Sequence, residues 1–329
     1  MDNLRVALAT SLASDDPLEF CYATLGFYTA RAAIRAKDIF VLDMTSGHSR
    51  FRGCYAAFGV TQISDQDYPT GQSDYASRMQ TSDTLKRRWY STMQGRMLRL
   101  WGYHFTIFVD IDEWLVPRAP HFDNLRSYLL NMSRTPLRHA VTAPHGYEVQ
   151  QVTSLEETSL SWDTGGAPLA QRHLWFRLCR LSKPIVSSVA LSFGVQWHTH
   201  TIEGPIHLDP CQQPASPYID ENLLLVHIKC IDLGVWGRNE TAARIKRYAH
   251  DLRRCSPLDG WVRANGRSCA DNPASCEDRP IALTWRTPKR GVGRVQLVPD
   301  WLRSMRWEAP TPARYRRAGR AAALPLAAR

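Results

Sequence analysis

The chain has 329 residues, 44% of them hydrophobic and 22% charged, and this length allows one large or two modest globular domains. No apolar run approaches the roughly 18–20 residues of a membrane span, and the N-terminus lacks the basic and apolar regions of a signal peptide, so neither a membrane-spanning nor a classically secreted protein is expected. The net charge of +10 comes almost entirely from residues 286–329, which hold eleven basic and two acidic residues. The first 285 residues hold 30 basic and 29 acidic residues. The body of the chain therefore does not resemble a nucleic-acid binder.

The first 60 residues predict strand, helix, strand and helix in succession. A short strand over 4–8 is followed by a helix capped by Asp16 and running to about residue 36. The continuous apolar run 39–42 has the length of a buried strand. A second helix over about 51–58 should end at Gly59.

The polar stretch from residue 65 to 83 is interpreted as a long loop over a site. A helix of about 18 residues should follow, with one apolar side that packs in the core. The residues of that side are Leu85, Trp89, Met93, Met97 and Leu100. A buried strand over 105–109 completes an alternation of strands and helices that predicts an α/β fold with a largely parallel sheet.

The rest of the chain is predicted to be less regular. A helix is expected over 122–131, a β-rich region over 138–230, with strands at 174–181, 185–193 and 223–228, and another helix over 237–254. We expect one domain over 1–250 and a basic, partly disordered C-terminal extension over 251–329.

The eight cysteines show no CxxC pair and no zinc-site spacing. Those in apolar surroundings, including Cys21 and Cys54, are interpreted as buried reduced thiols. This pattern favours a reducing compartment, and hence a cytoplasmic protein.

The most informative stretch is Phe105 to Pro117, where a buried strand ends in three acids, Asp110, Asp112 and Glu113. Ligands of α/β sheets bind beyond the carboxyl ends of strands. On an extended backbone Asp110 and Asp112 would face the same side, where they could hold Mg²⁺ or Mn²⁺ and leave positions for a diphosphate. The alternative is a solvated turn after a core strand.

These residues, FVDIDEWLVP, resemble the DxDE signature of family 2-like glycosyltransferases, and more closely a bacterial branch related to family 92 (DUF23). Three further segments agree in order: KDIFVLDMTSGHSRF, PLAQRHLWFRLCRLSKPIV with GVQWHTH, and LLLVHIKCID. The resemblance covers roughly residues 4–250. It implies a GT-A-type fold, Rossmann-like and mostly parallel with flanking helices, fused to a β-rich acceptor half, and a nucleotide-diphosphate sugar as donor with Mn²⁺ or Mg²⁺.

The resemblance also assigns expected roles to single residues. Asp110 and Asp112 would bind the metal and the diphosphate, with Asp112 as the more direct ligand and Glu113 as a catalytic or orienting acid beside them. Asp43 would contact the ribose or base, unless it only forms an Asx turn. A late histidine would complete the metal site, with His200 the first choice; His198 is the second and His227 the third.

Two cations are candidates for contacts with phosphates or the acceptor, Lys183 and Arg172. By contrast Lys86, Arg87 and Arg88 are interpreted as a solvated helix face. A general base would accept the proton of the acceptor hydroxyl, and no spacing rule selects among the acids that follow the DxD. Those candidates are Glu148, Glu156, Glu157, Asp163 and Glu203.

Two other classes of function stay open. A nucleotidyltransferase or phosphodiesterase would also use paired aspartates and metal ions, although no glycine-rich phosphate loop is present. A non-enzymatic binder of nucleic acid or acidic surfaces would act through the Arg-rich tail, where Trp301, Trp307 and Tyr315 alternate with arginines. For a transferase, the acceptor is a glycan, lipid or protein of unknown identity, and the tail could provide peripheral contact with a membrane.

Overall fold

The structure is a computed structural model of the chain. It describes residues 3–13, 16, 18–45, 51–64, 75–135, 140–150, 174–178, 182–193, 196–198, 201–203, 216–228 and 292–305. In these stretches, none of the helices combines the length and the apolar character needed to cross a bilayer.

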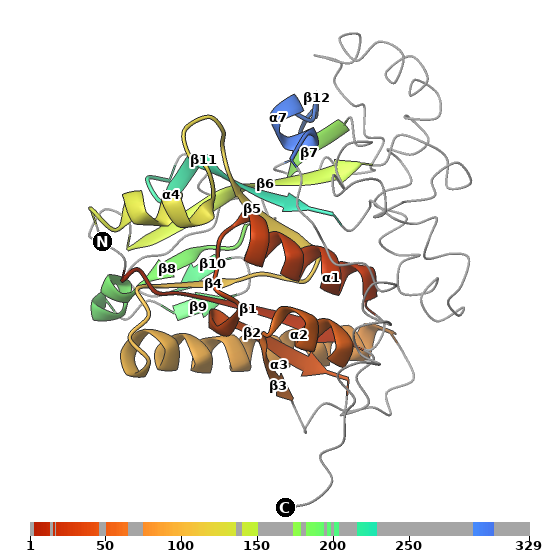
Figure 1. The fold of residues 1–329 in the computed structure, drawn as a ribbon, viewed down its shortest axis with the longest axis vertical. Coiled ribbons are helices and arrows are strands. Elements are labelled where there is room, and N and C mark those ends of the chain that lie inside the picture. Colours follow the sequence, from red (N-terminus) through yellow and green to blue (C-terminus); the bar gives the residue numbers. More distant parts are fainter. Residues whose placement is uncertain are drawn as a thin grey trace, which may run out of the picture.

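One large mixed sheet runs through the molecule (Figure 1). Across it the strands follow the order β12 (Val292–Leu297), β7 (Leu174–Leu178), β6 (Val141–Gln150), β8 (Ile185–Ser187), β4 (Phe105–Phe108), β1 (Val6–Ala13), β2 (Ile39–Met44) and β3 (Thr61–Ser64). Off this path, β11 (Ile219–His227) pairs with β6 and with β5 (Glu113–Pro117). A separate two-stranded ribbon consists of β9 (Gln196–His198) and β10 (Thr201–Glu203).

The strands β3, β2, β1 and β4 are all parallel, as in a Rossmann-like fold. Along the chain the sheet first grows from β1 through β2 to β3, and then β4 is added on the other side of β1. The order therefore reverses between β1 and β4. In doubly wound sheets such a switch point opens a crevice at the carboxyl ends of the strands, and ligands bind there.

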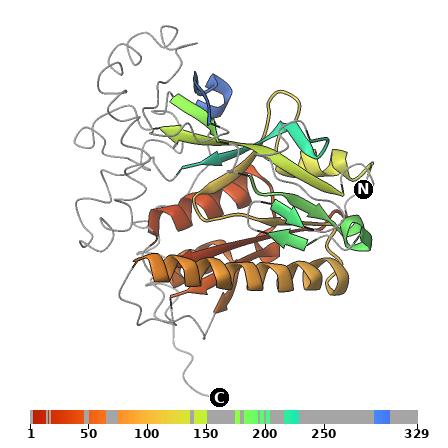
Figure 2. The same cartoon turned by 180° about the vertical axis from the view of Figure 1, so that it is seen from behind.

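The first three helices cover the two faces of the parallel strands, and the last two lie beside the β-rich half of the sheet (Figure 1). The helices are α1 (Leu18–Gly26) with a π-helical turn at Phe27–Arg31, α2 (Arg52–Phe58), α3 (Tyr75–Gly95) with a π-helical turn at Arg96–Leu100, α4 (Leu125–Met132) and α7 (Asp300–Arg303). Short 3-10 turns lie at Ala36–Asp38 and Ser188–Phe193. Figure 1 shows α1 and α2 in front of the sheet, and Figure 2, seen from behind, shows α3 crossing the other face.

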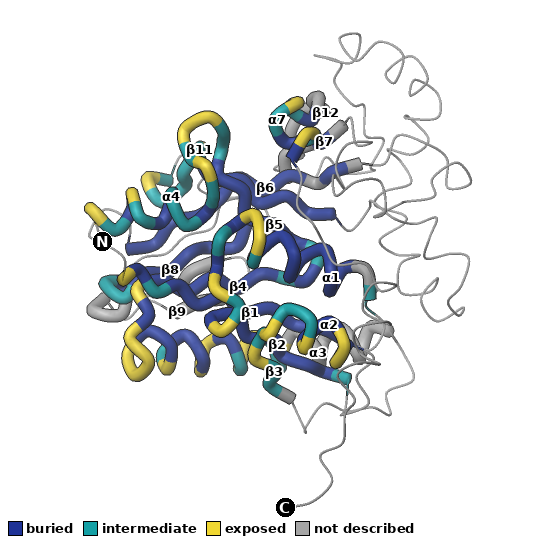
Figure 3. Tube along the Cα trace, viewed as in Figure 1, coloured by how far each residue is buried: buried dark blue, intermediate teal, exposed yellow. Residues whose placement is uncertain are grey.

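The side chains of β1 alternate between two hydrophobic cores, one on each face. Leu8 and its neighbours on one side pack with α1 and α2, whereas the small Ala7 and Ala9 face α3. Small residues let α3 approach the sheet closely, and Tyr90 from α3 stacks on Phe108 at 4.7 Å between ring centroids. Every residue of β1 and β2 is buried, as the dark tube at the centre of Figure 3 shows.

The α/β fold class is confirmed, with a parallel Rossmann-like half flanked by helices and a β-rich half. In the β-rich half β8, β6, β7 and β12 pair antiparallel with their neighbours along the path, while β11 runs parallel to β6. The predicted helix over 51–58 is confirmed, and it ends at Gly59, whose φ of 64° is left-handed. The predicted helix at 237–254 lies outside the described residues.

Four sequence predictions need correction. The loop expected over 65–83 is helical from Tyr75 onward, in a polar stretch that lacks the apolar periodicity by which a helix is predicted. Leu100, expected in the core, is 75% exposed at the end of the π-helical turn. The strand expected over 185–193 gives way to a 3-10 turn after residue 187. The first helix ends at Arg31, before residue 36, and Ala33 follows at φ 59°.

The C-terminal region contributes a strand to the sheet. β12 pairs antiparallel with β7, and α7 follows it directly, with Leu302 fully buried. Residues 292–297 of the predicted extension thus belong to the large sheet. The division at residue 250 stays a prediction.

Cys21 and Cys54 form a disulfide that joins α1 to α2. Both residues are fully buried. The prediction of reduced thiols at these two positions is therefore wrong, because the packing of α1 against α2 brings residues 33 positions apart within bonding distance. The pairing also removes the ground for inferring a reducing compartment from the cysteines.

Candidate functional site

The acidic cluster lies at the switch point of the sheet, in the turn that joins β4 to β5. The amide of Glu113 donates to the Asp110 carbonyl oxygen at 3.1 Å, and the amide of Asp110 donates to Glu113 Oε2 at 2.8 Å. These two reciprocal bonds close a four-residue turn over 110–113. The extended backbone expected between Asp110 and Asp112 is therefore wrong, and the two carboxylates meet different partners.

All four carbonyl oxygens of this acidic turn (residues 110–113) accept a hydrogen bond. Besides the bond inside the turn, the Ile111 oxygen accepts from the hydroxyl of Thr24, and the Glu113 oxygen accepts from the hydroxyl of Tyr28 at 3.0 Å. The Asp112 oxygen accepts from the amide of Ile228 at 2.9 Å. Because buried carbonyls need partners, this complete set fixes the backbone of the turn.

The tryptophan after the acids anchors the turn to α1. Trp114 is fully buried, its indole nitrogen donates to Thr24 Oγ1 at 3.0 Å, and its ring stacks on Phe27 with centroids 5.4 Å apart. The aromatic residue directly after the three acids therefore has a structural role. It joins the acidic turn to the helix that supplies the hydroxyls.

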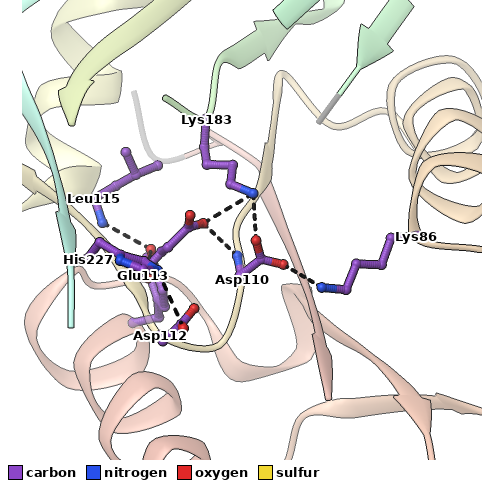
Figure 4. Close-up of polar contacts among 8 residues, drawn as sticks. Lys86, Asp110, Asp112, Glu113, Leu115, Lys183 and His227 are labelled. Carbon is purple, nitrogen blue, oxygen red and sulfur yellow. Dashed lines mark hydrogen bonds and ion pairs between the residues drawn. The ribbon is translucent and has the colours of Figure 1, made fainter. Parts of the chain in front are cut away.

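Two lysines hold the carboxylate of Asp110, as Figure 4 shows. Lys183 Nζ lies 2.7 Å from Asp110 Oδ2, and Lys86 Nζ lies 3.0 Å from Asp110 Oδ1. Lys183 also lies 3.4 Å from Glu113 Oε2. The lysines differ in exposure: the side chain of Lys183 is 1% exposed and that of Lys86 is 18% exposed.

The topology explains why Lys183 reaches the acidic turn. β8 runs antiparallel to β4, so the residues just before β8 lie beside the carboxyl end of β4. The hydroxyl of Ser182 donates to the Pro144 carbonyl oxygen at 3.3 Å, which holds this segment against β6. In this way Lys183 lies beside Asp110, although the two residues are 73 positions apart in the sequence.

The charges in this cluster shift one another's pKa values. Burial alone would raise the pKa of Asp110, but the ammonium groups of Lys183 and Lys86 outweigh it and hold the pKa well below its usual range. Burial raises the pKa of Glu113 to about 7, against the opposing effect of Lys183 and with the help of the Asp110 charge. Burial would lower the pKa of Lys183, yet Asp110 and Glu113 raise it above its usual value.

Asp112 points to a different partner. Its Oδ2 lies 3.5 Å from Nε2 of His227, the last residue of β11. The pairing of β11 with β5 sets His227 opposite Glu113, which explains how a residue so distant in sequence arrives here. A carboxylate oxygen facing an imidazole nitrogen is a donor pair that suits Mn²⁺ better than Mg²⁺, which prefers oxygen ligands alone, and a substrate would complete the coordination.

Asp43, the predicted ribose contact, lies at the carboxyl end of β2 and is 1% exposed. One of its oxygens accepts from the amide of Thr45 at 2.9 Å and from the Thr45 hydroxyl, and the other accepts from Gln62 Nε2 at 3.0 Å. The bond to an amide two residues ahead is the Asx turn that the sequence left open as the alternative. Contact with a nucleotide stays a prediction.

Several predicted site residues cannot be placed. Arg172 and His200 lie outside the described residues, as do the candidate bases Glu156, Glu157 and Asp163. His198, Glu203 and Glu148 lie on β9, β10 and β6, where the strand positions alone are described; Glu148 is paired in register with His227. In the part of the chain that the structure describes, no group of three or more His, Cys, Asp or Glu side chains is arranged to hold a metal ion.

Sequence reasoning missed Lys86 and the hydroxyls of α1. Lys86 was assigned to a solvated face, but it lies one helical turn before Tyr90, which is buried, and so it shares the side of α3 that faces the sheet. That spacing of four was visible in the sequence. Nothing in the sequence indicates that Thr24 and Tyr28 bond to residues more than 80 positions away.

No protein-family model and no curated protein matches this sequence. Among solved structures, the crystal structure of a mycobacterial protein aligns with 77% of this chain and 76% of its own, at 12% identity and a TM-score of 0.32. The crystal structure of S. aureus TarS aligns with 57% of this chain and 29% of its own, at 8% identity and a TM-score of 0.27. Likenesses this weak support no conclusion about function.

Proposed function

We propose that this protein is a glycosyltransferase that moves a sugar from a nucleotide-diphosphate sugar to an acceptor hydroxyl with the help of Mn²⁺ or Mg²⁺. The observation that carries the proposal is the acidic turn at the switch point of the sheet, with two ammonium groups on one side and the Asp112–His227 pair on the other. A diphosphate requires several cationic partners, and this edge of the sheet supplies them beside acids that can hold a metal ion.

The donor set around Asp112 fits the metal that the proposal needs. Asp112 and His227 would hold the ion, and phosphate oxygens of the donor would take further positions, as is usual for Mg²⁺ and Mn²⁺ in sites that bind phosphates. When bound, the ion neutralises charge that develops on the leaving nucleoside diphosphate. Asp110, whose two oxygens face ammonium groups, fits a direct ligand less well than Asp112 does.

The remaining residues orient the donor and the acidic turn. Lys183 is fixed between Asp110 and Glu113 and places a positive charge where the diphosphate would lie. Glu113 bonds to the backbone of Asp110 and acts as a positioning residue. In the transfer, the bond between the anomeric carbon and the phosphate oxygen breaks, a bond to the acceptor oxygen forms, and the acceptor proton passes to a base. Among the candidate bases Glu148 is the one whose strand position pairs with His227.

The test is a calorimetric titration of the intact protein with UDP and with GDP, each with and without Mn²⁺. We expect one nucleotide to bind with an affinity that depends on the metal, and Asp112→Ala to abolish that dependence. Metal-independent binding that Asp112→Ala leaves unchanged would contradict the proposed metal site. If neither these nucleotides nor CDP and dTDP bind to the folded protein, the acidic turn is a structural turn only.

Asp123→Ala is the matched control. Asp123 is exposed in the loop before α4, so its replacement removes the same charge from the chain without touching the acidic turn. It should bind like the wild type with and without metal. Circular dichroism spectra and melting temperatures should be compared for both variants before the titrations are interpreted.

A further inference from the structure

The two lysines on Asp110 are not equivalent in their freedom to move. Lys183 is buried and lies within 3.4 Å of two carboxylates, so displacing its ammonium group would leave charges buried without a partner. Lys86 contacts Asp110 from a partly exposed position on α3, where an ion pair is weak in free energy and its exchange costs little. Its flexible four-carbon stem lets the ammonium group swing.

The two lysines bind the carboxylate of Asp110 in the way that they would bind an anionic ligand. One ammonium group faces each of its two oxygens, at 2.7 Å and 3.0 Å. A phosphate group presents the same kind of oxygens to ammonium donors, and it carries more negative charge than a carboxylate. An arriving diphosphate would therefore compete with Asp110 for the lysine that is able to move.

We propose that Lys86 is the mobile half of a two-lysine clamp for the diphosphate of the donor: it pairs with Asp110 while the site is empty and transfers to a phosphate oxygen when the donor binds. Lys183 is the fixed half. Asp110 then acts as a placeholder for the donor phosphate: it holds the ammonium group of Lys86 at the site until the donor binds. This inference rests on the proposed function, which places a diphosphate at this edge of the sheet, and it adds a residue and a regulatory contact to it.

The helix fixes the position from which Lys86 acts. Tyr90 stacks on Phe108 of β4, Met93 continues the buried side of α3, and Met97 extends it into the π-helical turn. Lys86 lies at the start of this buried side, next to the carboxyl end of β4. Because the helix is locked against the sheet, movement of Lys86 is confined to its side chain.

Inorganic pyrophosphate is the probe, because it reports on diphosphate binding whatever the nucleotide is. The full chain is titrated calorimetrically with pyrophosphate in the presence of EDTA and again with Mn²⁺. The variants are Lys86→Met, which keeps the stem and the helix propensity, Lys86→Arg, which keeps the charge, and Arg88→Met. Arg88 is exposed on the same helix, so Arg88→Met removes one positive charge away from the site.

We expect Lys86→Met to weaken pyrophosphate binding roughly ten- to hundred-fold, the effect of losing one charge-assisted contact. Lys86→Arg should recover most of the affinity, and Arg88→Met should change it less than about three-fold. Asp110→Asn gives the sharpest result: with EDTA present it should bind pyrophosphate more tightly than the wild type, because the competing carboxylate is gone.

The outcomes separate this inference from the proposed function. If Lys86→Met binds pyrophosphate like the wild type while Asp112→Ala loses the metal-dependent part, the clamp is overturned and the proposed site stands. Weaker binding of pyrophosphate by Asp110→Asn under EDTA would overturn the placeholder role. If the folded wild-type protein binds neither pyrophosphate nor any nucleoside diphosphate, both proposals fail together.

Discussion

The two sides of the acidic turn are held by different chemistry. On the α1 side, the neutral hydroxyls of Thr24 and Tyr28 bond to backbone carbonyl oxygens. On the side of α3 and the segment before β8, the ammonium groups of Lys86 and Lys183 pair with carboxylates. The first set of contacts holds the backbone directly, whereas the second touches it only through the Glu113 carboxylate, which accepts from the Asp110 amide.

The contacts that position the turn therefore differ from the contacts that are available to bind a ligand. Hydrogen bonds between neutral groups keep the turn in place whatever charges are present, so a ligand can take an ammonium group from a carboxylate without moving the backbone. A site whose supporting bonds are independent of its charged contacts is preorganised for an anionic ligand. If this division holds, variants of Tyr28 on the neutral side and of the partly exposed Lys86 on the charged side should affect stability and binding in opposite proportions.

The largest effect on the charged side is expected for Lys183→Met. The substitution removes the buried ammonium group and leaves Asp110 and Glu113 facing each other, so the free energy of unfolding should fall by about 3–5 kcal/mol at pH 7.5. Urea unfolding measures it. Lys86→Met, which removes a partly exposed partner of the same carboxylate, should cost less than about 1 kcal/mol. Equal losses in the two variants would contradict the difference in burial.

Glu113 should make the stability depend on pH. Its pKa is raised to about 7 in the folded protein, against 4.5 for an unperturbed glutamate, so over this window the folded state keeps a proton that the unfolded state has released. The free energy of unfolding should therefore fall as the pH rises from about 4.5 to about 7, by roughly 3 kcal/mol. The lowered pKa of Asp110 has the opposite sign, and its stabilisation is lost only in more acidic solution.

The difference between wild type and Glu113→Gln isolates this contribution, because the amide can still accept from the Asp110 backbone but does not titrate. Urea unfolding at several pH values between 5 and 8 should give a shallower dependence in the variant. Parallel curves for the two proteins would mean that the Glu113 carboxyl keeps its ordinary pKa.

The local elements of this fold follow from the sequence, and so does the acidic end of β4. Buried apolar runs predicted β2 and β4, and Gly59 predicted the end of α2, since each depends on neighbours in the chain. The acids after β4 identified the site for the same reason. The predicted start of α3 was too late, because the polar stretch before residue 84 lacks the apolar periodicity that predicts a helix.

The contacts that bring the site residues together join residues that are far apart in the sequence. Lys183 reaches Asp110 because β8 runs antiparallel to β4, and His227 reaches Asp112 because β11 pairs with β5. Both depend on strand order, which periodicity does not encode. The pairing of Cys21 with Cys54 is hidden for the same reason, because it depends on the packing of two helices.

The neutral side is tested by Tyr28→Phe, whose effect on stability should be smaller than that of Lys183→Met. The hydroxyl of Tyr28 accepts from the Leu115 amide at 3.0 Å and donates to the Glu113 carbonyl oxygen, so its loss leaves two buried backbone groups without this partner. The free energy of unfolding should fall by about 1–3 kcal/mol, while pyrophosphate affinity should change only a few-fold. Lys86→Met should show the reverse: a small loss in the free energy of unfolding and a large loss of pyrophosphate affinity.

Tyr22→Phe is the matched control for the binding measurement. Tyr22 lies on the same helix, but its ring packs beside Phe58 of α2, 6.1 Å between centroids, and not at the acidic turn. Removal of its hydroxyl should leave pyrophosphate affinity unchanged. If Tyr28→Phe weakened binding as strongly as Lys86→Met does, the backbone and the charged contacts would act as one unit. The two sides of the turn would then be coupled, because loosening the chain would move Asp110 away from both lysines.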